Sequence, residues 1–182
     1  MNVLAVLGSP RKTSNSEIIA GSVLKAAEAA GATTTRIRLC DLKFSGCVSC
    51  MYCRTHEGCS QKDDLQKVYR AIDAADVLVI GFPIYMWAMN GQTKSFIDRL
   101  FPYLKADYTP RAKRRTVLCI SQGQADKAAF KANIDWATNV LGFLGFPVSD
   151  VIVEGNGNEP GAFSKRKELL SHAESVGKEL VS

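Results

Sequence analysis

Hydrophobic positions along the chain follow two patterns that alternate from one end to the other. One is a short, nearly continuous apolar run, which is typical of a strand buried on both faces of a parallel sheet. The other is a longer segment with apolar residues every three or four positions, which is typical of an amphipathic helix. The apolar runs predict strands over residues 2–8, 33–42, 76–83, 116–123 and 146–155. The periodic segments predict helices over residues 16–31, 63–75, 91–104, 127–145 and 162–181.

The order of these elements predicts an α/β fold. Strands that alternate with helices build a doubly wound parallel sheet covered on both faces, and five strands are expected in the order 2-1-3-4-5. No repeat or linker divides the sequence, so residues 1–182 are expected to form a single domain. Ligands of such sheets bind beyond the carboxyl ends of the strands, near the point where the strand order reverses. That rule selects the loops at residues 8–16, 82–92 and 121–125.

Composition and charge narrow the class of protein. With 46% hydrophobic and 23% charged residues, the chain is too apolar to be disordered. The net charge is +5, and Lys and Arg cluster only in residues 111–115. We interpret that run as a solvated loop, with a site for a phosphate-bearing ligand or an acidic partner as the alternative, and expect no nucleic-acid partner. No apolar stretch approaches the roughly 20 residues of a membrane span and no signal-peptide pattern is present, so we expect a cytoplasmic protein without a membrane partner.

The first selected loop, Gly-Ser-Pro-Arg-Lys-Thr-Ser-Asn-Ser-Glu, is rich in hydrogen-bond donors and cations. These are Ser9, Arg11, Lys12, Thr13, Ser14, Asn15 and Ser16. Loop amides and a helix N-terminus attract anions, and hydroxyl-rich cradles suit a terminal phosphate such as that of FMN. The spacing matches neither the Walker motif nor the dinucleotide motif. The alternative is ordinary N-capping by Ser14 or Asn15 in a solvated loop.

The second selected loop is unusually apolar for a loop. Its notable side chains are Pro83, Tyr85, Met86, Trp87, Met89 and Asn90. They suit a flat heteroaromatic ring, whose face packs on large apolar groups while amides bond its heteroatoms. The alternative is that they belong to the core or to a subunit interface. The third loop offers Ser121, Gln122 and Gly123 to the same ring.

Together, the first loop and the sequence Pro-Ile-Tyr-Met-Trp-Ala-Met-Asn-Gly-Gln-Thr-Lys-Ser-Phe-Ile-Asp-Arg resemble the NADPH-dependent FMN reductase family, which has a flavodoxin-like fold. The resemblance spans nearly the whole chain. It implies phosphate binding by Ser9, Arg11, Ser14, Asn15 and Ser16. It also implies contacts to the ring or ribityl chain from Pro83, Ile84, Tyr85, Met86, Trp87 and Asn90.

Four of the six cysteines lie within 13 residues, at Cys47, Cys50, Cys53 and Cys59. The spacing resembles the compact end of an Fe–S ligand set. A zinc site, thiol redox chemistry of Cys50 and Cys53, and thiols without a function remain open alternatives. Combined with the FMN loops, the motif resembles the iron–sulfur flavoproteins, which implies one [4Fe–4S] cluster and one FMN per subunit of a homo-oligomer.

Other candidate residues are assigned structural places. Cys40 and Cys119 fall in apolar strand patterns and are expected to be buried. His56 is expected to be a solvated loop residue, and His172 to lie on the surface. Apolar side chains at Trp87, and at Phe101 with Tyr103, would leave exposed patches on a monomer, so a homodimer or homotetramer is expected.

The expected function follows from this resemblance. The chain is expected to be a flavin-dependent oxidoreductase that passes electrons between a [4Fe–4S] cluster and FMN, with NAD(P)H, a ferredoxin or another electron carrier as candidate donor. No catalytic side chain is expected, because no Ser-His-Asp or paired-carboxylate arrangement is present. Two alternatives stay open: an NAD(P)H-dependent FMN or quinone reductase without a cluster, and a non-enzymatic flavin electron carrier.

Overall fold

A parallel sheet runs through the centre of the protein, which is described here over residues 1–182 by a computed structural model. Its strands lie in the order β2-β1-β3-β5-β6, which confirms the predicted fold and order. The strands are β1 (Asn2–Leu7), β2 (Thr33–Arg38), β3 (Val77–Tyr85), β5 (Arg115–Ser121) and β6 (Val148–Glu154). A short sixth strand, β4 (Ala88–Met89), pairs antiparallel with the end of β3 and was not predicted.

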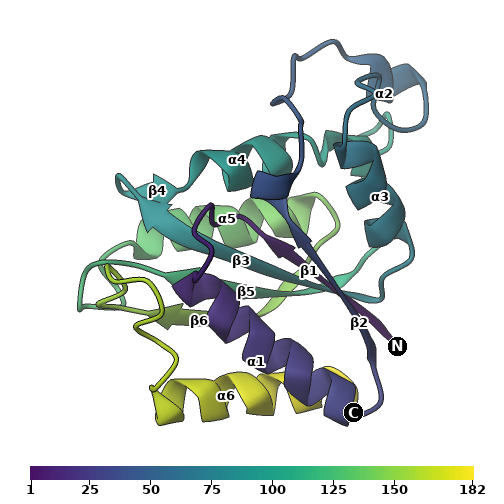
Figure 1. The fold of residues 1–182 in the computed structure, drawn as a ribbon. Helices are drawn as coiled ribbons and strands as arrows, with labels where there is room; N and C mark the ends of the chain where they lie inside the picture. The colour runs from purple at the N-terminus through teal and green to yellow at the C-terminus, as the bar shows by residue number, and fades with distance from the viewer.

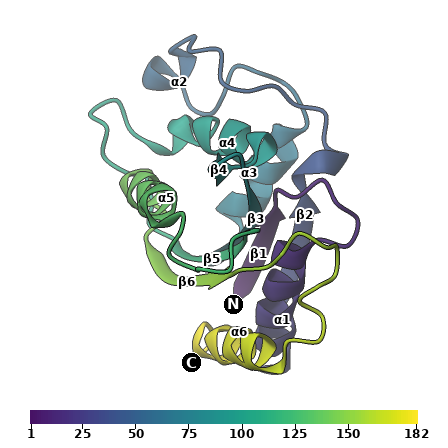
Figure 2. The ribbon, with the colours of Figure 1, turned by 90° about the vertical axis from the view of Figure 1, so that its left-hand side faces the viewer.

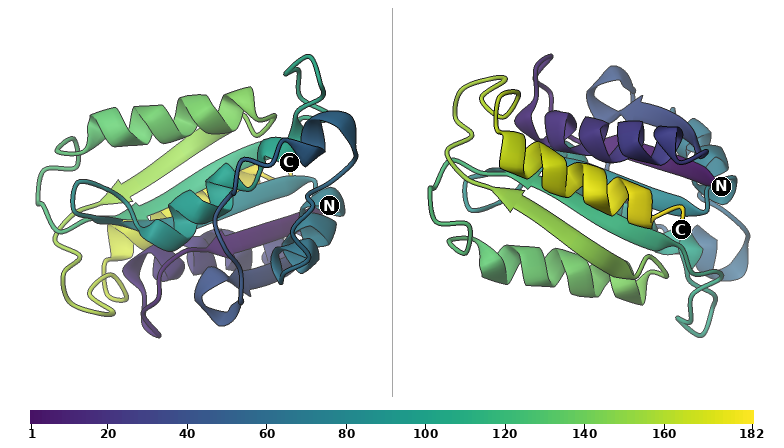
Figure 3. Two further views of the ribbon diagram at one scale, coloured as in Figure 1. Left: turned by 90° about the horizontal axis from the view of Figure 1, so that it is seen from above. Right: turned by 90° about the horizontal axis from the view of Figure 1, so that it is seen from below.

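Helices cover both faces of the sheet (Figures 1 and 3). One face carries α1 (Asn15–Ala29) and α6 (Lys167–Glu179), which pack against each other. The other face carries α3 (Leu65–Asp73), α4 (Gly91–Asp98) and α5 (Lys131–Phe143). Figure 2 shows the two layers of helices on either side of the strands.

The central strand β3 is buried on both faces, which explains why its sequence is an unbroken apolar run. Leu78, Ile80 and Phe82 belong to a core cluster of 24 buried residues on the α3–α5 face. Val77 and Val79 belong to a cluster of 18 buried residues on the α1–α6 face. Because both faces of the strand are buried, apolar side chains are favoured at every position rather than at alternate ones.

Several predicted elements end earlier or later than expected. The helix expected over residues 91–104 ends at Asp98, and Phe101–Tyr103 form a separate 3-10 turn. Pro102 lies in that turn and has no N–H with which to continue an α-helix. The strand expected to stop at Pro83 continues to Tyr85 before the chain reverses into β4.

The structure corrects two of the expected burials and confirms two. Cys40 is only half-buried, because β2 ends at Arg38 and Cys40 lies in the following 3-10 turn. Tyr103 is buried and Phe101 is half-buried, so they form no exposed patch. Cys119 is buried and His172 is exposed, as expected.

Residues 111–115 were predicted to form a solvated loop, but their arginines bond to other parts of the chain. Arg111 donates to the carbonyl of Pro102 at 2.9 Å. Arg114 donates to the carbonyl of Ala75 at 3.1 Å, and Arg115 forms an ion pair of 3.2 Å with Asp150. These guanidinium groups serve the fold by satisfying backbone carbonyls and bridging β5 to β6. No helix of the chain has the length and apolar character needed to span a membrane.

Candidate functional site

A cavity of about 440 Å³ opens beyond the carboxyl ends of β1, β3 and β5. Of the thirteen residues expected to bind a cofactor, ten line it: Ser9, Arg11, Ser14, Asn15, Pro83, Ile84, Tyr85, Met86, Gln122 and Gly123. Ser121, Gly157 and Asn158 complete the lining. Ser16, Trp87 and Asn90 do not reach the wall of the cavity. The structure thus brings the three selected loops together around one space.

The first loop presents buried hydroxyl groups and the start of α1 to this cavity. Ser14 caps the helix, since its Oγ accepts a hydrogen bond of 3.4 Å from the N–H of Glu17. The same Oγ lies 3.0 Å from the Oγ of Ser16. The Oγ of Ser9 accepts a 3.3 Å hydrogen bond from the N–H of Arg11. Hydroxyl groups and the positive end of a helix dipole therefore face one side of the cavity, which suits an anionic group.

A segment after β6, residues 155–163, completes this side of the cavity and was missed by the sequence analysis. Asn15 holds it: its Nδ2 donates to the carbonyl oxygens of Gly157 at 3.0 Å and Glu159 at 2.8 Å. Arg11 donates to the carbonyl of Asn158 at 2.7 Å. The only signal in the sequence is the turn-forming composition of Gly-Asn-Gly-Asn at residues 155–158.

The second loop is a tight hairpin with an uncommon backbone. Tyr85 pairs with Ala88, and the two residues between them, Met86 and Trp87, have φ angles of 45° and 68°. Such turns favour Asn-Gly, because bulky side chains in the left-handed region are strained. Met86 is 87% exposed and Trp87 is 67% exposed, so burial does not compensate for the strain. Strain of this kind is concentrated at functional sites.

Asn90 has a different place from the one expected. Its side chain is 1% exposed, and its Nδ2 donates to the carbonyl of Gly8 at 2.6 Å. Its Oδ1 accepts a 2.7 Å hydrogen bond from the hydroxyl of Thr93. The amide is therefore occupied in joining the first loop to the start of α4 and is not free to bond a ring. A Cβ on Gly8 would collide with the Thr93 side chain, so this close approach requires glycine.

Gln122 leaves one buried acceptor in the cavity wall without a partner. Its Nε2 donates to the carbonyl of Asp126 at 2.6 Å, whereas its Oε1 is buried and makes no hydrogen bond. Buried polar atoms are nearly always paired, so an unpaired amide oxygen in a cavity wall fits a ligand that donates an N–H or O–H group. The residues present therefore fit FMN at both ends, phosphate and ring.

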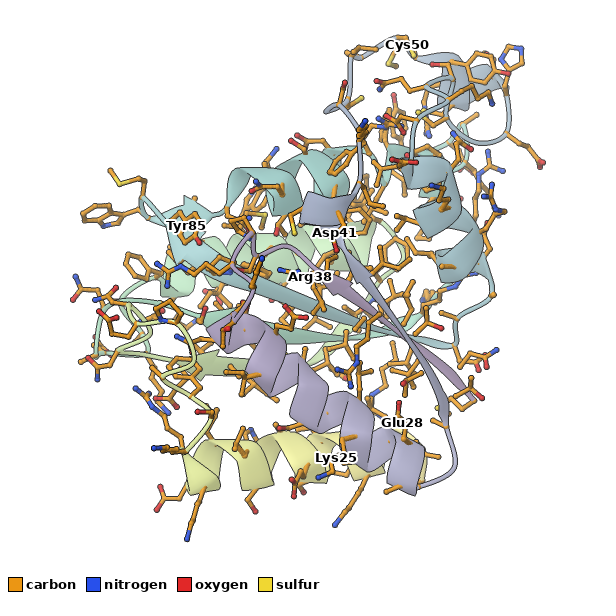
Figure 4. The ribbon with its side chains drawn as sticks, viewed as in Figure 1. Lys25, Glu28, Arg38, Asp41, Cys50 and Tyr85 are labelled. Carbon is orange, nitrogen blue, oxygen red and sulfur yellow. The ribbon has the colours of Figure 1, made fainter.

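The four clustered cysteines form a second site. All four line one pocket of about 50 Å³, together with Asp98, Arg99 and Phe101. The loop rises above α3 and α4 and includes the short helix α2 (Tyr52–Thr55) (Figure 1). Figure 4 shows Cys50 at the top of the molecule and Tyr85 at its side. The pocket thus lies at the carboxyl end of α4.

The thiols of this pocket are unpaired. A hydrogen bond of 3.1 Å with the hydroxyl of Ser60 lowers the pKa of Cys50 below its ordinary value. The N–H of Ser49 donates to the Sγ of Cys47 at 3.4 Å. His56 is exposed and stacks on Tyr52 instead of lining the pocket, which agrees with a solvated loop residue.

The four thiols do not meet at one point. No three His, Cys, Asp or Glu side chains converge closely enough to hold one metal ion. A single zinc ion needs such convergence. A four-iron cluster takes one thiolate on each iron, so its thiolates surround it without meeting at a point. Four thiols line one pocket and a backbone N–H donates to one of the sulfurs, which is compatible with a cluster.

Comparison with known proteins identifies a family and several relatives of this chain. The family described as NADPH-dependent FMN reductase matches residues 1–157. An iron-sulfur flavoprotein of Archaeoglobus fulgidus is 33% identical over 154 residues, which cover 83% of this chain and 74% of that protein. A second one from the same organism is 31% identical over 103 residues, which cover 57% of this chain and 47% of that protein, so the match spans about half of its length.

Among solved structures, an NAD(P)H:quinone oxidoreductase from Methanothermobacter marburgensis has a similar fold, with a TM-score of 0.73 and 20% identity. The similarity covers 100% of this chain and 98% of that chain. Because the family match covers far more than half of the sequence, the chain belongs to the NADPH-dependent FMN reductase family.

Proposed function

We propose that this protein is a flavin-dependent oxidoreductase that binds FMN in the cavity at the strand ends and holds a [4Fe–4S] cluster with Cys47, Cys50, Cys53 and Cys59. The observation that carries the proposal is the presence, on one chain, of a cavity with a hydroxyl-rich helix N-terminus and a pocket lined by four free thiols. Relatives named iron-sulfur flavoprotein support the pairing of the two groups.

Each part of the chain has a distinct role in this proposal. When bound, FMN supplies an exchange between two-electron and one-electron transfer, and the cluster supplies one-electron transfer. Ser9, Ser14 and the N-terminus of α1 bind and orient the phosphate. Pro83, Tyr85 and Gln122 border the other end of the cavity, where they position the ring and exclude water from one side. No side chain is assigned a proton-transfer role.

A reductase without a cluster is the second candidate, and one observation favours it. As they stand, the cysteines do not converge on a metal position, and the cavity for FMN does not depend on them. Such an enzyme would oxidise NAD(P)H and reduce flavin or quinone with the cysteine loop empty. A flavin carrier without turnover is the third candidate and would bind FMN without oxidising NAD(P)H.

We also propose that the protein forms a homo-oligomer in the cytoplasm. The exposed hairpin residues Met86 and Trp87 support an interface, and six unpaired cysteines support a reducing compartment. The donor would be NAD(P)H, a ferredoxin or another electron carrier.

The experiment that separates the candidates compares the wild-type chain with Cys47→Ser and Cys53→Ser under anaerobic conditions. The readouts are the visible spectrum and the rate of NAD(P)H oxidation with added FMN. We expect the variants to lose the broad absorbance of the cluster and to retain the flavin bands. If wild type and variants have the same spectrum and oxidise NAD(P)H at the same measurable rate, the reductase without a cluster is the correct function; the same spectrum with no oxidation would instead indicate the flavin carrier.

A further inference from the structure

Arg99 is a buried cation at the base of the four-thiol pocket. It follows the last residue of α4 directly, its side chain is 1% exposed, and it lines the pocket that the cysteines line. Arginine is seldom buried to this extent unless all of its donors are used. The hydrogen bonds of Arg99 therefore indicate the role of this buried side chain.

The guanidinium bonds both stems of the cysteine loop at once. On the entering stem, Nη1 donates to the carbonyl of Ser45 at 2.8 Å, two residues before Cys47. On the leaving stem, Nη1 and Nη2 donate to the two oxygens of Asp63 at 2.7 and 3.0 Å, four residues after Cys59. A planar fork with several donors can make this pattern, whereas the compact ammonium of lysine cannot.

Arg99 is in turn fixed by α3. Its Nε donates to the hydroxyl of Tyr69 at 3.3 Å, and that hydroxyl donates to the carbonyl of Arg99 at 2.8 Å. Tyr69 is itself buried. The Arg99 side chain is therefore held in place by the packed helices α3 and α4 and not by the cysteine loop to which it bonds.

The cysteine loop has no core of its own, and the other bonds between its stems come from the stems themselves: Lys43 with Asp64 at 2.8 Å, and Gln61 to the carbonyl of Gly46 at 3.2 Å. Its one helix, α2, has 4 residues, and Val48 and Met51 are 62% and 49% exposed. The other strong anchor is Arg54, which donates to the carbonyl oxygens of Phe101 and Lys105 at 2.7 Å each. Arg54 holds the tip of the loop, whereas Arg99 bonds both stems at the base from a position outside the loop. A loop without a core of its own opens locally when such an anchor is lost.

We propose that Arg99 is the positioning residue of the four-thiol pocket: it clamps the stems at Ser45 and Asp63 so that Cys53 and Cys59 are held facing Cys47 and Cys50. This inference deepens the proposed function, and only its consequence for iron loading rests on that function. The clamp acts in the chain whether or not iron is present.

The test measures thiol reactivity in the iron-free chain. Wild type and Arg99→Lys are treated with iodoacetamide, and the modification of each cysteine is followed by peptide mass spectrometry. Cys53 and Cys59 are half-buried, and Cys119 is buried in the core and reports global unfolding. We expect Arg99→Lys to raise the rates at Cys53 and Cys59 roughly tenfold or more, because a buried bidentate pair is lost. Cys119 should remain unmodified.

The matched control is Arg115→Lys. Arg115 also uses its fork on several partners, including Ser149 at 2.8 Å and Asp150 at 3.2 Å, but it lies between β5 and β6, away from the loop. It should leave the rates at Cys53 and Cys59 unchanged. Unchanged rates at these two thiols in Arg99→Lys would contradict the proposal.

A second variant keeps the test decisive if Arg99→Lys unfolds and Cys119 becomes reactive. Tyr69→Phe removes the hydroxyl that fixes Arg99 and leaves the guanidinium and Asp63 in place. It should raise the same two rates by a smaller factor. If Cys119 reacts as fast as the loop thiols in this variant too, or if no rate changes, Arg99 is a general stabilising residue and the proposal is wrong.

Iron loading separates this inference from the proposed function. After anaerobic reconstitution, we expect Arg99→Lys to retain less iron per chain than wild type. If wild type takes up no iron but the labelling result holds, the clamp is correct and the cluster is not. If wild type takes up iron and Arg99→Lys labels like wild type, the cluster is correct and the clamp is not.

Discussion

The side-chain amide of Asn90 donates to the backbone carbonyl of Gly8 at 2.6 Å, across 82 residues of sequence. This hydrogen bond joins the loop after β1 to the loop after β3, the two loops that form most of the cavity wall. Asn90 itself does not line the cavity. Its effect on ligand binding would therefore be indirect, through the distance between the two loops.

Replacing Asn90 by alanine tests this role. The change leaves the Gly8 carbonyl and the Thr93 hydroxyl without their partner in the interior, so we expect a loss of about 1–3 kcal/mol in the free energy of unfolding. FMN affinity should fall with it. Urea unfolding and quenching of flavin fluorescence measure the two effects. Gln92→Ala, which removes only the partly buried contact to Asn90, is the control and should have a small effect on both.

Ser14→Ala should weaken binding of the phosphate specifically. Loss of the N-cap costs about 1 kcal/mol of stability. Because the hydroxyl also faces the cavity, FMN affinity should fall by roughly tenfold, whereas riboflavin, which has no phosphate, should bind wild type and variant alike. Equal losses for both flavins would show that Ser14 only caps the helix.

The strained backbone of the β3–β4 hairpin predicts that relieving the strain raises stability and lowers function. The double variant Met86→Asn with Trp87→Gly supplies the residues that this backbone favours, so the protein should become more stable by about 1 kcal/mol. If the exposed side chains serve the flavin or a partner subunit, flavin-dependent turnover or oligomerisation should decrease at the same time. Thermal unfolding, steady-state rates and light scattering test both parts. A more stable variant with unchanged turnover and mass would leave the strain without a function.

The ion pair between Arg99 and Asp63 predicts that the stability of the fold depends on pH. Burial opposes ionisation of this carboxyl, but the hydrogen bonds and charge of Arg99 outweigh it and lower the pKa of Asp63 below its ordinary value. A lowered pKa in the folded state means that the unfolded chain binds the proton first. The contribution of the ionised Asp63 carboxylate to the free energy of unfolding is thus complete above about pH 4, and it is lost as the pH falls through the lowered pKa.

Urea unfolding between about pH 6 and pH 3 measures this effect, with Asp63→Asn as the comparison. Wild type should lose more stability over this range than the variant, which has no carboxyl to titrate at position 63. Parallel losses in the two proteins would show that Asp63 does not contribute.

The sequence predicts most of this fold for a definite physical reason. Strands such as β3 are buried on both faces, so their apolar runs stand out from the helices, and glycine- and serine-rich loops mark the strand ends. The cavity follows, because carboxyl ends of parallel strands meet at one edge. Ten of the thirteen expected residues therefore line one space, whereas the other three, Ser16, Trp87 and Asn90, do not reach its wall.

What could not be predicted depends on contacts between distant residues. Met86 and Trp87 give no turn signal, so the β3–β4 hairpin was missed. The segment at residues 155–163 closes the cavity only because Asn15 bonds it from the other end of the chain. The cysteine loop lies where Arg99 holds it, and no local pattern connects that arginine to Ser45 or Asp63.

The content of flavin and iron in protein purified without oxygen decides between the candidates for this chain. The proposed function predicts about one FMN, about four iron atoms and about four acid-labile sulfides per chain, because each cysteine of the pocket would hold one iron of a single cluster. Protein that contains a full complement of FMN and no iron or sulfide, even after anaerobic reconstitution, would contradict it.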